Sequence, residues 1–275
     1  MKDTGGKNPS LSLAEWFGLG SLVTAVLILF LDVRLFSFPL VGFILICIAA
    51  PFFPRFSFYL AIISRGISGK RAVALTFDDG PDPLSTPVLL RLLLKHSVKA
   101  TFFVIGEKAA AHPELINAIV SQGHSIGNHT YTHDYLVLFK NRKHLLKEIE
   151  STQKALGGLG IVSLVFRPPS GITSPGLGQV LGRLGLDNIN FSCRAFDGGN
   201  QRIKNLSKKI LKRIRPDDIV LLHDISPKNK FLLHYWLDEL ESLLTGLEAK
   251  GLSVFPLSKL IGKPVMIKKT SGGHD

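Results

Sequence analysis

The chain has 275 residues, a length that fits one medium domain with an additional segment, and its 45% hydrophobic content and mean hydropathy of +0.25 indicate a membrane segment. The charged fraction of 20% excludes a largely disordered chain, and the formal net charge of +12 favours anionic partners such as phosphate-bearing lipids and membrane surfaces. The only two cysteines, Cys47 and Cys193, exclude a disulfide framework and a cysteine-based zinc finger.

Two charge-free apolar runs follow a short N-terminal tail, residues 1–15. The run 16–31 has 16 residues and measures about 24 Å as a helix, and the run 35–54 has 20 residues and measures about 30 Å, the thickness of a hydrocarbon core. We therefore predict transmembrane segments within 16–54, at about 16–31 and 35–53, which form a helical hairpin. One spanning helix with a re-entrant or interfacial piece is the alternative. A signal peptide fits poorly, because no small-residue cleavage site follows the first run.

Lysine and arginine are distributed unevenly around the hairpin. Two lysines precede the first run and one arginine lies in the turn at 32–34, whereas four basic residues follow the second run between 55 and 71. Because basic flanks stay in the cytoplasm, we expect both ends of the hairpin, and the domain after it, on the cytoplasmic side of an inner or plasma membrane. Residues 55–69 are then an interfacial linker, with the aromatics of 56–63 in an interfacial helix.

From residue 70 to 265, apolar strands alternate with helices. This alternation predicts a parallel sheet, and about seven such units favour an α/β barrel over an open sheet. Residues 266–275 are expected to be a C-terminal tail. The predicted strands are 72–77, 99–105, 124–127, 163–166, 188–191, 218–222 and 252–256, and the predicted helices are 87–96, 113–122, 140–156, 178–184, 203–214 and 231–247.

Polar residues gather directly after several predicted strands. Because the carboxyl ends of parallel strands open at one edge of the sheet, residues that follow them converge there from distant parts of the sequence. The residues concerned are Asp78, Asp79, His129, His133, Arg167, Asp197 and His223.

His129 and His133 stand four residues apart. On one helical turn this spacing directs both imidazoles to the same side, where they can share a metal ion, although the spacing alone fits a structural role better. A carboxylate from Asp78 or Asp79 completes a two-histidine, one-carboxylate set with one place left for water. Neighbouring side chains of an extended segment point apart, so the second carboxylate stays free to accept a proton. The competing interpretation of this Asp-Asp-Gly-Pro segment is a plain turn.

Five short segments stand in a characteristic order: Thr76-Phe77-Asp78-Asp79-Gly80-Pro81, Val98 to Gly106, Gly123 to His133, Arg167-Pro168-Pro169-Ser170-Gly171, and Ile219 to Asp224. Together they resemble the polysaccharide deacetylase family, also called the NodB-homology family or carbohydrate esterase family 4, over about residues 70–260. The resemblance implies a distorted (β/α) barrel and a divalent metal, usually zinc. It also implies removal of N-acetyl, and sometimes N-formyl or O-acetyl, groups from sugars.

The resemblance also implies roles for individual residues. Asp79, His129 and His133 match the metal ligands of the family, and Asp78 matches its general base. The remaining matches are Arg167, which would orient Asp78; His223, the general acid; Asp197, which would tune His223; Leu221, which would line the acyl pocket; and Ser170, whose backbone N–H would stabilise the oxyanion. Chemically, His223 needs a nearby carboxylate to be protonated near neutrality, and Asp197 or Asp224 can supply it.

The fourth motif of the family, Asp-x-x-Asp-Trp, is altered. Arg194 replaces the first Asp and Gly198 replaces the Trp, while Asp197 remains. Loss of the Trp removes one wall of the acyl pocket, and Ser170 stands where a Tyr is common. Arg194 suits a phosphate-bearing sugar, but it fits a solvated surface charge equally well.

These features predict a membrane-anchored, metal-dependent hydrolase that removes an N-acyl group, acetyl or formyl, from an amino sugar of a polysaccharide or a lipid-linked saccharide. The expected partners are such a glycan and membrane lipids; nucleic acid is not expected, because no base-stacking aromatic array is present. A catalytically weakened saccharide-binding module is one alternative, supported by the altered fourth motif. An O-acetyl esterase that uses the same residues is another.

Overall fold

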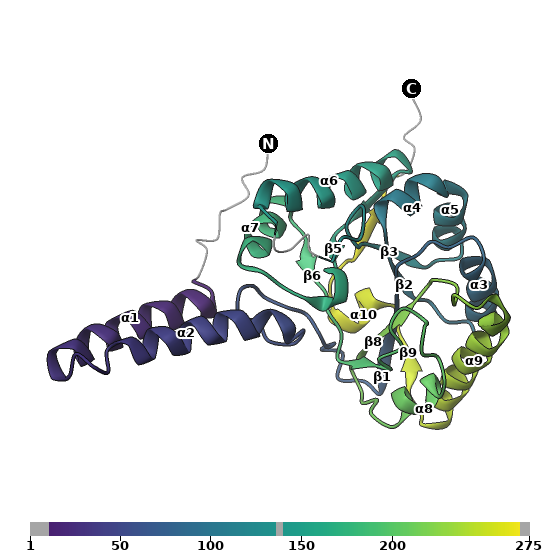
Figure 1. Ribbon diagram of the computed structural model, residues 1–275. Coiled ribbons are helices and arrows are strands. Elements are labelled where there is room, and N and C mark those ends of the chain that lie inside the picture. The colour runs from purple at the N-terminus through teal and green to yellow at the C-terminus, as the bar shows by residue number, and fades with distance from the viewer. Residues whose placement is uncertain (1–10, 136–139, 270–275) are drawn as a thin grey trace.

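A helical hairpin projects from an α/β domain in the computed structural model, which describes residues 11–135 and 140–269 (Figure 1). Helix α1 (Leu13–Leu31) begins at a capping box formed by Ser12 and Glu15, and α2 (Ser37–Ala49) continues into a 3₁₀ turn, η1 (Ala50–Phe52). Within the described residues, α1 is the one helix long and apolar enough to cross a membrane, and α2 is shorter. The two helices pack side by side, and the turn between them lies farthest from the domain.

Most of the hairpin surface is apolar and uncovered. Ala25 is the only buried residue of α1, α2 has none, and Phe30 and Leu31 are 83% and 86% exposed. A large exposed apolar surface costs free energy in water, so this surface requires another apolar environment to cover it.

The stretch 56–63 does not form the interfacial helix that we predicted; it is irregular. Its aromatic side chains pack on one another instead, with Phe58 buried between Phe56 and Tyr59. Ile63 then pairs with the edge of the sheet, where its N–H donates to the Asn188 carbonyl at 2.9 Å. This segment therefore attaches the hairpin directly to the α/β domain.

The main sheet is parallel and curled, with the strand order β6-β5-β3-β2-β1-β8-β7 and β9 paired to β1. The sheet is curled into an incompletely closed barrel, in agreement with the distorted (β/α) barrel that the resemblance implied. Strand β1 pairs with β2, β8 and β9, and its register with β8 places Asp78 beside His223. The strands are β1 (Ala72–Asp78), β2 (Thr101–Val104), β3 (Ser125–Asn128), β5 (Val165–Phe166), β6 (Asp187–Asn188), β7 (Cys193–Arg194), β8 (Ile219–His223) and β9 (Ser253–Val254), while β4 (Ile161–Ser163) pairs antiparallel with β10 (Met266–Lys268).

Helices surround the sheet (Figure 1). The core between the sheet and helices α3, α5 and α9 is built from fully buried Leu, Ile and Phe side chains around Trp236. Burial of such side chains contributes about 1.5–3 kcal/mol each, which fixes the strand ends relative to one another. The helices of the domain are α3 (Ser85–Lys95), α4 (Gly106–Ala111), α5 (Pro113–Ser121), α6 (Arg142–Gly158), α7 (Pro175–Leu184), α8 (Leu206–Leu211), α9 (Leu233–Ala249) and α10 (Leu257–Ile261).

Several elements differ from the predictions. The expected strand 163–166 is divided between two sheets, because β4 pairs with β10 whereas β5 pairs with β3 and β6. The predicted helix 203–214 is confined to α8, since Asn205 before it has a left-handed backbone with φ 58°. Strand β10 lies in the stretch that we expected to be a tail. Helices α4 and α10 and strand β7 were not predicted from the sequence.

Candidate active site

Two adjacent aspartates lie at the carboxyl end of strand β1. Asp78 is the last residue of β1 and is 4% exposed, and Asp79 follows with a left-handed backbone, φ 71°. Lys108 donates to the Asp79 carbonyl at 2.7 Å and holds this turn. The reversal at Asp79 sends the two carboxylates to different partners, so they can take different chemical roles.

His129 and His133 lie in an irregular loop after β3, not on the helical turn that we predicted. Thr130 and His133 have φ values of 66° and 56°, which an α-helix does not accommodate. The loop is held by Glu148 of α6, which accepts hydrogen bonds from the N–H groups of Tyr131 and Thr132 at 3.1 and 2.9 Å. Backbone reversals, instead of helical spacing, bring the two imidazoles together, with ring centroids 4.8 Å apart.

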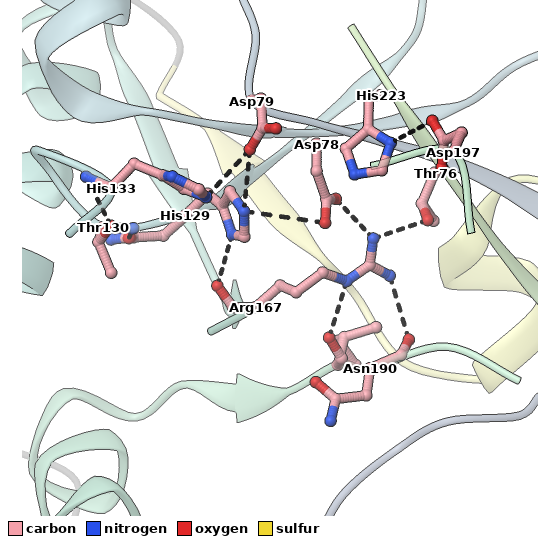
Figure 2. A network of polar contacts seen from close by, with 12 residues as sticks. Thr76, Asp78, Asp79, His129, Thr130, His133, Arg167, Asn190, Asp197 and His223 are labelled. Carbon is pink, nitrogen blue, oxygen red and sulfur yellow. Dashed lines mark hydrogen bonds and ion pairs between the residues drawn. The ribbon is translucent and has the colours of Figure 1, made fainter. Parts of the chain in front are cut away.

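The two histidines and Asp79 converge on one point (Figure 2). Asp79 Oδ1 lies 3.4 Å from His129 Nε2 and 3.1 Å from His133 Nε2, and one ligand atom from each residue lies within 4.8 Å of the others. The free carboxylate oxygen Asp78 Oδ2 lies 3.8 Å from His129 Nε2. Figure 2 shows Asp78 beside this group, between the histidines and His223.

The donor set fits a divalent metal ion. His129 Nδ1 lies 2.7 Å from the Arg167 carbonyl and donates to it, so Nε2 is the ring nitrogen that faces Asp79. Burial alone would raise the pKa of Asp79, but hydrogen bonds and charge attraction from both imidazoles hold that pKa well below its usual range. Metal binding requires both Nε2 atoms to be deprotonated, and an ionised carboxylate with two such imidazole nitrogens is a ligand set that zinc prefers.

Arg167 is fully buried and organises the site. Its Nη1 donates to Asp78 Oδ1 at 2.6 Å and to Thr76 Oγ1 at 2.8 Å. Its other nitrogens donate at 3.1 Å to the carbonyls of Ile189 and Asn190, and the guanidinium lies over the Phe103 ring at 4.0 Å. All three guanidinium nitrogens therefore donate a hydrogen bond, which fixes the orientation of the Asp78 carboxylate.

His223 ends β8 on the other side of Asp78, and its Nδ1 lies 2.7 Å from Asp197 Oδ2. Burial would lower the pKa of His223, but the hydrogen bond and charge of Asp197, with the charges of Asp79 and Asp78, raise it to about 9. The ring is thus protonated at neutral pH. Asp224, the other carboxylate considered from the sequence, instead accepts hydrogen bonds from two hydroxyl groups at the start of α3.

The other predicted residues lie outside this hydrogen-bonded network. Leu221 is nearly buried on β8, two residues before His223 and therefore on the same face of the sheet. Ser170 is exposed, with a left-handed backbone at φ 58°. Arg194 is half-buried, with its guanidinium 4.2 Å from the ring centroid of the exposed Phe196 and 5.2 Å from that of Phe191.

Three supporting residues were not identified from the sequence: Thr76, Asn128 and Glu148. The Asn128 side chain accepts from Thr130 N–H at 3.0 Å and donates to the Ile149 carbonyl at 2.9 Å, which fastens the histidine loop to α6. Glu148 carries a signal that could have found it, because this acidic residue occupies a position on the buried face of an amphipathic helix.

Comparisons with known proteins identify relatives of this chain. The family profile described as polysaccharide deacetylase matches residues 65–189. A chitooligosaccharide deacetylase of Bradyrhizobium sp. (strain ANU 289) is 34% identical over 203 residues, which cover 70% of this chain and 92% of that protein. A solved peptidoglycan N-acetylglucosamine deacetylase, in complex with a naphthalenyl-N-oxidanyl-benzamide, has a TM-score of 0.68 and 30% identity over 76% of this chain and 95% of its own.

A second solved structure is described as a CE4 family pseudoenzyme from Bacillus anthracis. It has a TM-score of 0.65 and 25% identity, and the match covers 73% of this chain and 68% of that one. The fold is therefore shared by proteins described as deacetylases and by one described as a pseudoenzyme. The fold alone does not distinguish an active enzyme from an inactive one, so the function has to be inferred from the site residues.

Proposed function

This chain belongs to the polysaccharide deacetylase family, and we propose that it is itself a membrane-anchored, metal-dependent N-deacetylase. The relatives that are named deacetylases hydrolyse the amide C–N bond of acylated sugars. The proposed substrate is a glycan or lipid-linked saccharide that contains an N-acetylated amino sugar. The observation that carries this proposal is the convergence of Asp79, His129 and His133 beside the separate carboxylate of Asp78.

A divalent cation, which we propose to be zinc, would be held by Asp79 Oδ and the Nε2 atoms of His129 and His133. Such an ion supplies Lewis-acid chemistry, since it activates water and polarises an amide carbonyl. The Nδ1 hydrogen bond of His129 to the Arg167 carbonyl supports this assignment, because it fixes the ring in the orientation that a ligand requires.

Asp78 is the proposed general base. One of its oxygens is taken by the contact with the Arg167 guanidinium, while the other lies 3.8 Å from His129 Nε2 and faces the ligand group. The facing oxygen can accept a proton from the attacking water, a role that typically contributes 10²–10⁴-fold in rate. Arg167 positions this carboxylate and does not itself touch the reacting atoms.

His223 is the proposed general acid. Because its pKa is raised to about 9, it carries a proton at neutral pH and can donate it from Nε2 to the departing amine nitrogen. Asp197 holds the opposite ring nitrogen and stabilises the protonated form. The backbone N–H of Ser170 would donate to the developing oxyanion, and Leu221 would contact the acyl methyl group.

We further propose that the hairpin anchors the enzyme in a membrane with the catalytic domain on the cytoplasmic side. The exposed apolar surfaces of α1 and α2 and the basic flanks support this arrangement. A C-terminal reporter that is active on only one side of the membrane tests it. Activity of the reporter on the exported side would contradict the proposed orientation.

The activity is tested with the purified full-length chain, loaded with zinc, and a series of N-acetylated amino-sugar oligomers and lipid-linked amino sugars. Acetate release by the wild-type chain, lost by at least about 100-fold in Asp78→Asn at unchanged zinc content, is the expected result. Glycan binding without acetate release would instead support a saccharide-binding module, the alternative that Arg194 and Gly198 in the fourth motif favour.

A further inference from the structure

A cavity of about 690 Å³ lies where the hairpin meets the catalytic domain, outside the site described above. One of its walls is formed by the end of α2 and η1, and the opposite wall is formed by the first turns of α6 and α7. Figure 1 shows the end of α2 close to the domain on the side of α7. Its two walls differ in chemistry, because one is apolar and the other carries hydrogen-bond donors and cations.

The clearest sign of a ligand is Ser174, which lines the cavity. This residue is 4% exposed, and its hydroxyl oxygen has no hydrogen-bond partner within the described residues. Ser174 occupies the N-cap position of α7, a helix of ten residues, yet its side chain does not cap the helix. A buried hydroxyl without a partner costs about 1–3 kcal/mol. The first N–H of α7 belongs to Gly176, because Pro175 has none, and it has no acceptor within the helix, whereas the Leu177 N–H already donates to the Ser174 carbonyl at 3.1 Å. An anion at this point satisfies both the Ser174 hydroxyl and the Gly176 N–H.

Cationic side chains stand on the same wall. Lys140 and Arg142 lie at the start of α6 and line the cavity. Lys140 forms an ion pair with Asp134 at 2.6 Å, and Arg142 donates to the side chain of Gln179, so each is already directed by a neighbour. The positive ends of two helix dipoles, α6 and α7, add to this charge. A guanidinium, an ammonium, a hydroxyl and the Gly176 N–H offer more donors than the two oxygens of a carboxylate accept, and they suit a phosphate.

The opposite wall is apolar. It contains Ile48 of α2 and Phe52 of η1, which are 62% and 61% exposed, together with Tyr59, whose hydroxyl is turned away to the Cys47 carbonyl at 2.6 Å. A ligand that touches both walls must therefore combine an anionic head with an apolar chain. We propose that this cavity binds the phosphate head group of a membrane lipid, with the phosphate against Ser174 and Arg142 and the hydrocarbon chain along α2.

This cavity adjoins the catalytic edge of the sheet through a short loop. The Thr173 N–H donates to the Pro51 carbonyl at 3.4 Å, and the Asn190 side chain donates to the carbonyls of both Pro54 and Gly171. Gly171 directly follows Ser170. A lipid head group held here therefore orders the same loop that carries the proposed oxyanion donor. The binding site itself does not depend on the proposed deacetylase activity.

Binding is tested by isothermal titration calorimetry of the full-length chain in a neutral detergent. Four probes are compared: short-chain phosphatidic acid, the matching diacylglycerol without phosphate, a fatty acid of similar chain length, and inorganic phosphate. Phosphatidic acid is expected to bind at least about tenfold more tightly than each of the others, since only it contacts both walls. Equal binding of diacylglycerol or of the fatty acid would overturn the phosphate assignment, and equal binding of inorganic phosphate would overturn the lipid assignment.

Matched variants locate the site. Arg142→Gln should weaken phosphatidic acid binding about tenfold, and Ser174→Ala about fivefold, as expected for a charged and a neutral hydrogen bond. Lys143→Gln removes the same charge from the next residue of α6, which does not line the cavity, and should leave the affinity unchanged. Equal losses in Arg142→Gln and Lys143→Gln would show attraction to general surface charge and would overturn the proposal. Unchanged affinity in both Arg142→Gln and Ser174→Ala would also overturn it.

Discussion

Arg167 contacts the Asp78 carboxylate at 2.6 Å in a site where both side chains are almost completely buried. The backbone carbonyl of Arg167 also accepts the Nδ1 hydrogen bond of His129 at 2.7 Å. One residue thus positions the proposed general base with its side chain and a proposed metal ligand with its main chain. The arrangement couples the stability of the site to its chemistry, because a buried charge requires its partner.

Replacement of this arginine should therefore destabilise the fold strongly. Arg167→Met leaves the Asp78 carboxylate buried without a cation and should lower the free energy of unfolding by about 3–5 kcal/mol. Adding Asp78→Asn to that variant should recover part of the loss, because the unpaired charge is removed. Denaturant unfolding of the single and double variants measures the coupling. Arg183→Met, at an exposed position of α7, is the control and should change stability by less than about 0.5 kcal/mol. Strictly additive effects of the two site substitutions would contradict this account.

The dependence of the rate on pH should follow the protonation of His223, whose pKa depends on Asp197. His223 donates a proton only while it is protonated, below its pKa, so the rate should fall as pH rises through about 9. Asp197→Asn removes the strongest contact that raises this pKa and leaves burial, which lowers it, so the fall should move to lower pH by about one unit or more. Profiles of kcat/KM against pH measure the shift. The exposed Asp238→Asn should leave the profile in place, and an unmoved profile in Asp197→Asn would rule out His223 as the acid.

Glu148 should determine metal affinity although it is not a ligand. It holds the loop between His129 and His133 through two backbone N–H groups and the Thr132 hydroxyl. Glu148→Ala should weaken zinc binding by about 10–100-fold, the usual effect of losing a residue that orients ligands. Glu148→Gln keeps one acceptor oxygen and should restore most of the affinity. Glu150→Ala, on the exposed side of the same helix, is the control in competitive chelator titrations. An unchanged zinc affinity in Glu148→Ala would contradict the proposed role of Glu148 in orienting the ligands.

Loss of one histidine ligand should abolish metal binding and activity together. His133→Ala removes one of three ligands, so zinc content measured by atomic emission should fall from about one ion per chain to near zero. The wild-type chain should lose acetate release in a chelator and regain it when zinc is added. His234→Ala, at an exposed position of α9, should keep both its zinc and its activity. A His133→Ala chain that retains a full equivalent of zinc would contradict the proposed ligand set.

The order of local elements follows from the sequence because apolar periodicity depends on residues that are near one another in the chain. The alternation of strands and helices predicted the curled parallel sheet. The polar residues at strand ends predicted that Asp79, His129 and His133 come together, and their ligand atoms do lie within 4.8 Å of one another. The His-x-x-x-His spacing, however, indicated a helical turn, which is wrong, since local spacing carries no information about the left-handed backbone of Thr130 and His133.

Contacts between distant segments were decided only by the tertiary structure. Nothing near Glu148 in the sequence indicates that its carboxylate meets the backbone of Tyr131. The sequence also left open whether Asp197 or Asp224 pairs with His223; in the structure Asp197 does, whereas Asp224 accepts hydrogen bonds from two hydroxyl groups of α3. The cavity beside Ser174 is likewise assembled from α2, α6 and α7. Residue type and local pattern determined which chemical groups this chain possesses, whereas packing of the whole chain decided their distances, and hydrogen bonds and pKa values depend on those distances.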